Sequence, residues 1–156
     1  IIISGGGHNM AAGFTLNKEN LKAFEGYILE DFLKSETINN NIFSYESEIS
    51  SLAFNQNFYE DIKKLEPFGT GNLVPTFFLR DLKVIKPVVL NNKHISIVLK
   101  SHTGFTIKSI SFNSINTKVG EYLMTYKNNI NVIGQISENI WNNKKTLQLT
   151  IRDVIL

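Results

Sequence analysis

The sequence predicts an α+β fold that is mainly β, in which a short α/β segment precedes a five-stranded barrel. Three observations predict it. Five strand-like runs follow one another between residues 76 and 155, a stretch of helical periodicity interrupts them after the third run, and a polar stretch separates them from an N-terminal strand and helix. Short strands joined by turn residues are typical of barrels and sandwiches.

The composition supports a globular chain and excludes several kinds of function. Hydrophobic residues make up 42% of the 156 residues, which is enough for a packed core. There is no cysteine, so disulfides and thiolate metal sites are excluded. No apolar run approaches the ~20 residues that cross a bilayer, so we expect a cytoplasmic protein without a membrane partner. The formal charge of only +2 does not by itself predict nucleic-acid binding.

The N-terminal residues predict a strand, a loop and the start of a helix. Residues 1–3 are isoleucines, which are typical of a buried strand. The chain thus starts as if inside a sheet, and we expect it to be a fragment. Residues 4–8, Ser-Gly-Gly-Gly-His, interrupt the strand as a loop, and residues 9–13 are compatible with a first helical turn.

A helix is expected next, followed by a boundary. Asn17 is a suitable N-cap, and apolar residues then recur three and four positions apart up to about Lys34. These residues are Leu21, Phe24, Ile28 and Phe32. Residues 35–41 are polar and predict a linker, so we divide the chain into residues 1–38, a connecting segment 39–72 and a barrel domain 73–156.

The connecting segment predicts an extended stretch, a short helix and a turn. Residues 42–52 have extended character, and Asn55 can cap a helix that Pro67 ends. The apolar face of this helix would carry Phe58, Ile62 and Leu65. In the turn that follows, Gly69 and Gly71 allow a sharp bend and Asn72 can close it with a side-chain hydrogen bond.

The remaining residues predict five strands and one helix. The strands are expected at residues 76–86, 94–100, 105–112, 130–141 and 146–155, and the helix at 116–126. Turn signals are Asn91-Asn92, residues 101–104 and Asn142-Asn143, although we interpret the abundance of asparagine mainly as compositional bias. Five strands with a helix between the third and fourth are the arrangement of an OB-fold, which often binds nucleic acids or oligosaccharides. The fold alone does not establish the ligand.

The glycine-rich segment is the first candidate site. Three consecutive glycines let the backbone take positive φ and approach a ligand without Cβ interference, and N–H groups at a helix start bind phosphate. The candidate phosphate-binding residues are Ser4, Gly5, Gly6, Gly7 and His8. The alternative is a tight turn in which the glycines only permit close packing.

The barrel supplies a second set of candidates. Single-stranded DNA needs a basic groove with aromatic side chains for stacking. The candidate DNA-binding residues are Arg80, Lys83, Lys93, Lys100 and Lys108, with ordinary solvated surface positions as the alternative. Trp141 either stacks on a base at the barrel rim or, as we favour, caps the core beneath its hairpin. His94 and His102 lack a matching carboxylate cluster, so no metal site is predicted.

Two motifs resemble those of a known family. Residues 5–14, Gly-Gly-Gly-His-Asn-Met-Ala-Ala-Gly-Phe, resemble the signature of the DHH-associated domain in the DHH phosphoesterase superfamily. Residues 65–75, Leu-Glu-Pro-Phe-Gly-Thr-Gly-Asn-Leu-Val-Pro, resemble the segment that leads into the OB domain of RecJ exonucleases, except that Leu73 stands where the family often has proline. Together they resemble the C-terminal region of the RecJ family. On this interpretation Met10, Ala11 and Ala12 are packing residues.

The resemblance implies a function for the longer protein. It implies a 5′-to-3′ single-stranded-DNA exonuclease of recombination and repair, in which a DHH domain absent here holds Mn²⁺ or Mg²⁺. This chain would hold no metal and no catalytic residue and would be inactive alone, with His8 as a candidate contact to the substrate in the transition state. The implied partners are single-stranded DNA, the DHH domain and other repair proteins. The alternative is a non-catalytic OB-fold module that binds a protein partner or stabilises the enzyme.

Overall fold

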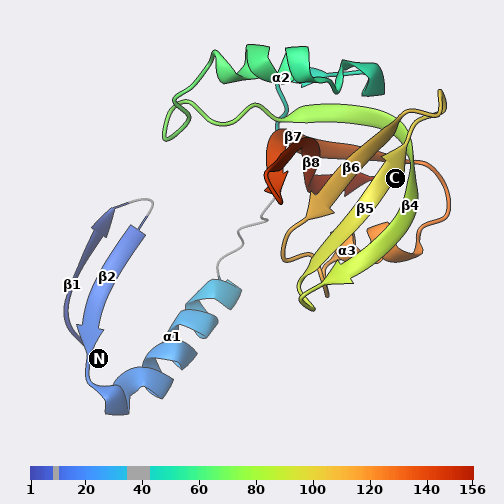
Figure 1. Ribbon diagram of the computed structural model, residues 1–156. Coiled ribbons are helices and arrows are strands. Elements are labelled where there is room, and N and C mark those ends of the chain that lie inside the picture. Colours follow the sequence, from blue (N-terminus) through green and yellow to red (C-terminus); the bar gives the residue numbers. More distant parts are fainter. Residues whose placement is uncertain (9–10, 35–42) are drawn as a thin grey trace. The chain divides into compact units, whose positions relative to one another are not determined.

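The computed structural model describes residues 1–8, 11–34 and 43–156, which belong to two compact units. The first unit comprises residues 1–42 and the second residues 43–156. Figure 1 shows a hairpin and a helix in the first unit and a barrel in the second. The predicted linker at residues 35–41 lies outside the described residues. No helix of the described part is long and apolar enough to cross a membrane.

The first unit begins with an antiparallel hairpin, which corrects two predictions. Strand β1 (Ile2–His8) contains the whole glycine segment, and β2 (Ala11–Leu16) occupies the place of the predicted first helical turn. Glycine can continue a strand when a partner strand supplies the hydrogen bonds, and the helix propensity of alanine is only a weak preference. A Cβ on Gly7 would lie 2.7 Å from the Cβ of Ala12, so glycine permits this close approach.

Helix α1 (Leu21–Lys34) follows a 3₁₀ turn (Lys18–Asn20) and covers the stretch in which the sequence predicts a helix. The side chain of Asn17 makes no capping hydrogen bond, so the predicted cap is not formed. The Phe24 ring packs on Phe14 of the hairpin, with ring centroids 4.6 Å apart. No residue among 1–8 and 11–34 is buried. The predicted strand at residues 1–3 is confirmed for residues 2 and 3, but its predicted burial is wrong, as are the core positions predicted for Ala11 and Ala12. Met10 lies outside the described residues.

The second unit starts with a short strand and a helix that precede the barrel. Strand β3 (Ser47–Glu48) pairs in parallel with the first barrel strand, and a 3₁₀ turn (Ser51–Ala53) leads to α2 (Gln56–Lys63). The predicted cap is confirmed, because Asn55 Oδ1 accepts a hydrogen bond of 3.1 Å from the backbone N–H of Phe58. Ile62 is buried, whereas Leu65 lies beyond the helix and is exposed.

The turn after α2 has the predicted geometry. Asn72 Nδ2 donates hydrogen bonds of 2.9 Å to the carbonyl oxygens of Leu65 and Pro67. Gly71 has a φ of 87°, in the left-handed region that glycine adopts without a steric penalty. The Asn72 amide therefore links the end of the turn to the residues that precede it.

The barrel consists of five strands in the OB order. They are β4 (Phe77–Leu90), β5 (His94–Lys100), β6 (Thr106–Ser111), β7 (Ile130–Trp141) and β8 (Lys144–Ile155), with α3 (Lys118–Thr125) between β6 and β7. The strands pair in the order β4-β5-β6-β8-β7, and pairing of β4 with β7 closes the barrel. The predicted OB-fold is confirmed.

Strand β4 curves so that it can pair on both sides. Figure 1 shows it sweeping around the barrel. Its register shifts between Leu79 and Leu82 and again between Ile85 and Val88. At these irregularities Asp81 and Lys86 take left-handed φ values of 55° and 50°. Such bulges bend a strand and increase its twist, which barrel closure requires.

The core lies entirely inside the barrel and beneath α2 and α3. Its fully buried side chains are Leu79, Leu82, Ile95, Leu99, Ile107, Leu123, Ile130, Val132 and Leu149. Phe58 of α2 packs on Phe77 with ring centroids 5.3 Å apart. Every second residue of β5 and β6 is buried, as expected for strands with one face toward a core. In β4 and β7, residues 77–79 and 132–134 are buried consecutively.

The hairpin turns correct two further interpretations. Asn91, Asn92, Asn142 and Asn143 all have positive φ, between 47° and 59°, so these asparagines serve the turns rather than merely reflecting composition. Asparagine tolerates this conformation better than most residues. Beside the second turn, Trp141 is 73% exposed, so the favoured role of capping the core is wrong.

Candidate nucleic-acid interface

Three of the five predicted basic residues share the outer face of the barrel. Lys83 of β4 lies directly opposite Lys100 of β5, and Val98 of β5 lies opposite Lys108 of β6. Val98 and Lys100 are two residues apart on one strand, so their side chains point to the same face. All three lysines are exposed. The structure thus places a basic group across three neighbouring strands.

The same face carries an exposed aromatic pair toward its other end. The His94 and Phe112 rings meet edge to face with centroids 5.2 Å apart, and Phe112 is 54% exposed. His94 Nδ1 accepts a hydrogen bond of 2.9 Å from the backbone N–H of Asn113, which holds the imidazole in place. Sequence reasoning missed both residues as stacking candidates. The signal was available, since each lies an even number of residues from a lysine of this face.

The two remaining predicted residues lie elsewhere. Lys93 is in the β4–β5 turn, where its backbone N–H donates to Leu90 O at 3.0 Å. Arg80 Nε donates a 2.6 Å hydrogen bond to Glu48 Oε1, and its guanidinium lies 4.9 Å from the centroid of the Phe78 ring. The hydrogen bond from Arg80 lowers the pKa of Glu48, so the carboxylate stays charged and neutralises the arginine.

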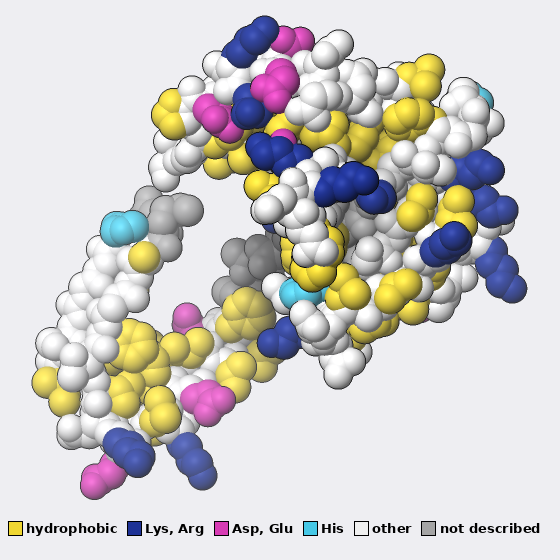
Figure 2. All heavy atoms as spheres, in the orientation of Figure 1, with side chains coloured by type: hydrophobic (Ala, Val, Ile, Leu, Met, Phe, Trp, Pro, Cys, Tyr) yellow, Lys and Arg dark blue, Asp and Glu magenta, His cyan; other side chains and the backbone are white. Residues whose placement is uncertain are grey.

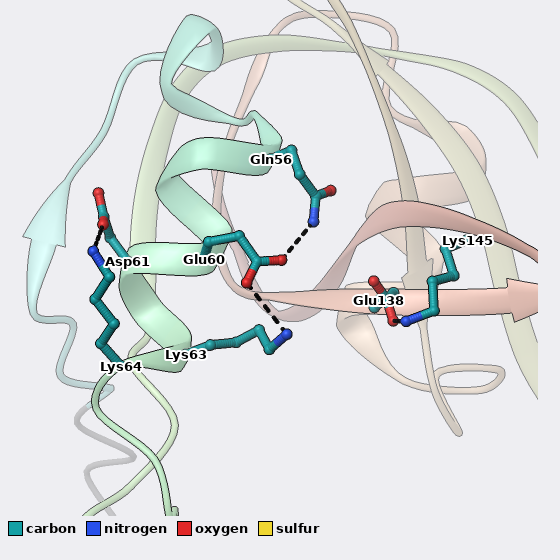
Figure 3. Close-up of polar contacts among 7 residues, drawn as sticks. All are labelled: Gln56, Glu60, Asp61, Lys63, Lys64, Glu138 and Lys145. Carbon is teal, nitrogen blue, oxygen red and sulfur yellow. Dashed lines mark hydrogen bonds and ion pairs between the residues drawn. The ribbon is translucent and has the colours of Figure 1, made fainter.

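Charge is distributed unevenly over the barrel unit. Figure 2 shows Lys and Arg side chains with hydrophobic side chains between them on the right of the barrel, whereas acidic side chains gather over α2. On α2 the lysines are paired locally, with Lys64 2.7 Å from Asp61 and Lys63 3.3 Å from Glu60 (Figure 3). The α2 side therefore offers a polyanion little net positive charge.

One face of the glycine hairpin has no side chain at Gly6 and Gly13, and we call it the bare face. Ser4, Gly6 and His8 alternate with Gly5 and Gly7, and Gly6 lies opposite Gly13. A Cβ on Gly6 or Gly13 would meet nothing within 4 Å, so both positions expose backbone. Phe14, which contacts α1, lies on the other face.

The predicted phosphate loop is therefore corrected in its geometry. Among the described residues the glycines with positive φ are Gly71 and Gly104, so Gly5, Gly6 and Gly7 are extended. Their N–H groups do not converge at a helix start. The structure instead places Ser4, His8 and the Gly6–Gly13 pair on one face of the hairpin.

A metal centre cannot be assembled from the described ranges. No group of three or more His, Asp or Glu side chains in residues 1–8, 11–34 and 43–156 could hold a metal ion. His94 is hydrogen-bonded and His102 lies in the β5–β6 turn.

A family model described as the RecJ OB domain matches residues 45–153, the whole of the barrel and the segment before it. The chain belongs to the RecJ OB domain family. Single-stranded-DNA-specific exonuclease RecJ of Bacillus subtilis (strain 168) is 25% identical over 159 residues, which cover 95% of this chain and 19% of that protein. The chain therefore spans about a fifth of the length of this RecJ relative.

Solved RecJ structures share the fold. RecJ from Thermus thermophilus in complex with Mg²⁺ aligns with a TM-score of 0.60 at 19% identity, covering 99% of this chain and 23% of that one. The same protein in complex with Mn²⁺ aligns with a TM-score of 0.60, covering 98% of this chain and 22% of that one. The barrel and its order of strands are thus those of a RecJ protein.

Proposed function

We propose that this chain is the DNA-binding C-terminal region of a single-stranded-DNA-specific 5′-to-3′ exonuclease that acts in recombination and repair in the cytoplasm. The observation that carries the proposal is the outer face of β4, β5 and β6, where Lys83, Lys100 and Lys108 lie on the same surface as the His94–Phe112 pair. The name of the B. subtilis relative supports single-stranded DNA as the ligand.

The lysines of this face suit the backbone of a single DNA strand, and its aromatic pair suits the bases. Lysine side chains attract backbone phosphates and release their counterions, whereas aromatic rings stack on unpaired bases. Lys83 and Lys100 sit at one end of the face and the aromatic pair at the other, with Lys108 between them. A duplex keeps its bases stacked inside, so only a single strand can use both parts.

The hairpin supplies a second contact to the strand. A phosphate can approach the backbone at Gly6 and Gly13 because no Cβ stands there. Ser4 and His8 can donate hydrogen bonds to its oxygens from the same face. Gly5 and Gly7 contribute indirectly, since the absence of a Cβ on Gly7 permits its close approach to Ala12 of β2.

We assign cleavage to residues outside this chain. The described residues do not fit a metal centre, so no catalytic step is assigned to them. We place the metal in a DHH domain elsewhere in the longer protein, with this chain holding the phosphate backbone near it and inactive alone. The T. thermophilus RecJ structures contain Mg²⁺ or Mn²⁺, which supports these metals for the whole enzyme.

Fluorescence anisotropy with a labelled, 5′-phosphorylated oligodeoxynucleotide tests the proposal. The chain should bind the single strand in preference to the duplex, and a plot of log affinity against log salt should have a slope of about −0.7 per phosphate neutralised. Replacing both Lys83 and Lys100 with alanine should make that slope shallower by about 1.4, for two lost phosphate contacts. Lys64→Ala is the matched control, because Lys64 is also exposed but lies at the C-terminal cap of α2 beside Asp61.

The hairpin is tested in the same assay. Gly6→Val adds a side chain to the bare face without a clash inside the chain, and His8→Ala removes the imidazole. Both should weaken binding of the single strand. Unchanged binding in both variants would restrict recognition to the barrel. Binding without salt dependence or without preference for single strands would contradict the proposal and favour a protein-interaction module.

A further inference from the structure

A cleft of about 630 Å³ opens beside the basic end of the outer face. Its walls come from residues 48–52, from Arg80 and Asp81 of β4, and from residues 101–103 in the β5–β6 turn. Ligand pockets for small molecules commonly measure about 300–1,000 Å³, so a single nucleobase fits with room for water. The cleft lies wholly within the second unit.

The cleft lies next to the pair of Lys83 and Lys100, on both β4 and β5. Lys83 follows Asp81 by two residues on β4, and Lys100 immediately precedes Ser101, which is buried at the cleft wall. Because Lys83 and Lys100 lie directly opposite each other, the pair stands beside the cleft. A strand whose phosphates contact these lysines would therefore bring one of its nucleotides to the cleft.

The lining of the cleft disfavours a phosphate and favours hydrogen-bond donors. Two acidic residues, Glu48 and Asp81, are among those that line it. One oxygen of each is occupied, by Arg80 Nε at 2.6 Å and by Asn129 Nδ2 at 2.7 Å. The second oxygen of each accepts no hydrogen bond from the residues that the structure describes. Carboxylates are acceptors only, so they suit an amino group and repel an anion.

Asp81 occupies an unusual backbone position in this wall. Its φ of 55° lies in the left-handed region, and its own N–H is held by Asn131 Oδ1 at 3.1 Å. Left-handed residues other than glycine are uncommon and concentrate at turns, bulges and functional sites. The irregularity of β4 thus falls at a residue that lines the cleft.

We propose that this cleft accepts a nucleobase that carries an exocyclic amino group, from a DNA strand whose phosphates lie on Lys83 and Lys100. The inference rests on the proposed function, since it needs a single strand on the outer face. Apolar parts of Ile49 and Leu52 lie against the ring of the base, and the carboxylate of Asp81 accepts from its amino group. Cytosine presents an amino group at position 4, where uracil and thymine present an acceptor oxygen.

The test compares oligo(dC) with oligo(dU) of the same length in fluorescence anisotropy near neutral pH. These pyrimidines are similar in size and stacking surface, so the comparison isolates the hydrogen-bonding edge. We expect oligo(dC) to bind at least about fivefold more tightly, the lower end of what a well-placed contact to a base edge contributes. Equal affinity for the two oligonucleotides in the unmodified chain would overturn the inference.

Two variants test whether the preference for oligo(dC) arises at this cleft. Asp81→Asn removes the charge while retaining an acceptor for Asn129, and asparagine tolerates the left-handed backbone at least as well as aspartate. Ser50→Phe fills the cleft at a position where the serine side chain makes no capping hydrogen bond. Both should bring the ratio of the two affinities close to one. A ratio that persists in Asp81→Asn, folded as judged by circular dichroism, would exclude this cleft.

Lys100→Ala separates failure of the inference from failure of the proposed function. It should weaken binding to both oligonucleotides and leave their ratio above one. Equal oligo(dC) and oligo(dU) affinities that both fall in Lys100→Ala would keep the DNA-binding face and exclude the base-binding cleft. No binding of either oligonucleotide would overturn the proposed function, and the inference with it.

Discussion

The two units of this chain bury their apolar residues to very different degrees. The barrel unit encloses a core whose largest members, such as Leu79 and Leu99, have no exposed surface. In the hairpin–helix unit no described residue is buried, and Leu29 and Leu33 of α1 are 55% and 82% exposed. The difference teaches that, among the described residues, the barrel unit alone has a buried core. The hairpin–helix unit forms regular elements but supplies no core for them.

The largest expected effect comes from making the same substitution in both units. Leu99→Ala should destabilise the barrel by about 2–5 kcal/mol, because it leaves a cavity among fully buried side chains. Leu29→Ala should change stability by less than about 0.5 kcal/mol, since the leucine is half exposed and alanine is a good helix former. Urea unfolding followed by circular dichroism measures both. Comparable losses would show that α1 has a buried contact within this chain.

Two glycine substitutions test whether the turn before the barrel requires a left-handed backbone at Gly71. Gly71→Ala should cost about 1–2 kcal/mol, because its φ of 87° is a left-handed conformation that a Cβ penalises. Gly69→Ala is the matched control, since Gly69 lies in the same turn, has no positive φ and has free space around a Cβ. Thermal unfolding of both variants should shift only for Gly71. A shift of equal size for Gly69 would contradict the backbone explanation.

An asparagine pair compares helix starts in the two units. Asn55→Ala should cost about 1 kcal/mol, because the side chain accepts a hydrogen bond from the N–H of Phe58 at the start of α2. Asn17→Ala should have little effect, since Asn17 makes no such bond. Denaturant midpoints measure both. If Asn17→Ala lowers the midpoint more than Asn55→Ala does, the hairpin–helix unit depends on its cap more than the barrel unit does.

The smallest expected effect concerns the ion pair of Glu48 and Arg80. Arg80 lowers the pKa of Glu48 below its usual 4.5 in the folded chain, so the charged carboxylate stabilises the fold. A lowered pKa gives stability that is present above the unfolded pKa and is lost as pH falls through the folded value. Glu48→Gln should therefore be slightly less stable than the unmodified chain near pH 7, and equally stable in acid below this range.

This comparison is checked by urea unfolding at several pH values. The pair is exposed, so solvent screens it and the difference near neutral pH should be small. A stability difference that grows as the pH falls would have the wrong sign and would exclude the ion pair as its cause.

Most of the barrel could be predicted because its pattern is local. Alternation of buried and exposed residues, asparagine turns and the helix after the third strand are all properties of neighbouring residues. The N-terminal segment could not be predicted in this way. Three glycines and two alanines have weak preferences, and their pairing as β1 and β2 depends on contacts across the hairpin.

The candidate site was predicted in part for the same reason. The basic residue types of the barrel are visible in the sequence, but their grouping is not. Lys83, Lys100 and Lys108 come together because strand register places them on one face, while Arg80 is directed to Glu48. The exposure of Phe112 and Trp141 also depended on which side of each strand faced the core.

The sequence by itself determined the order of elements, the OB arrangement and the two motifs that indicate the RecJ family, because each is encoded in short stretches of chain. Only the tertiary structure decided that the glycine motif is a strand with one bare face, that three lysines share a surface, and that a cleft with two carboxylates adjoins them. Residues 48, 81 and 101 meet at this cleft because β4 pairs with β3 on one side and with β5 on the other. A local pattern cannot carry that information, since register and strand bulges are set by packing of the whole barrel.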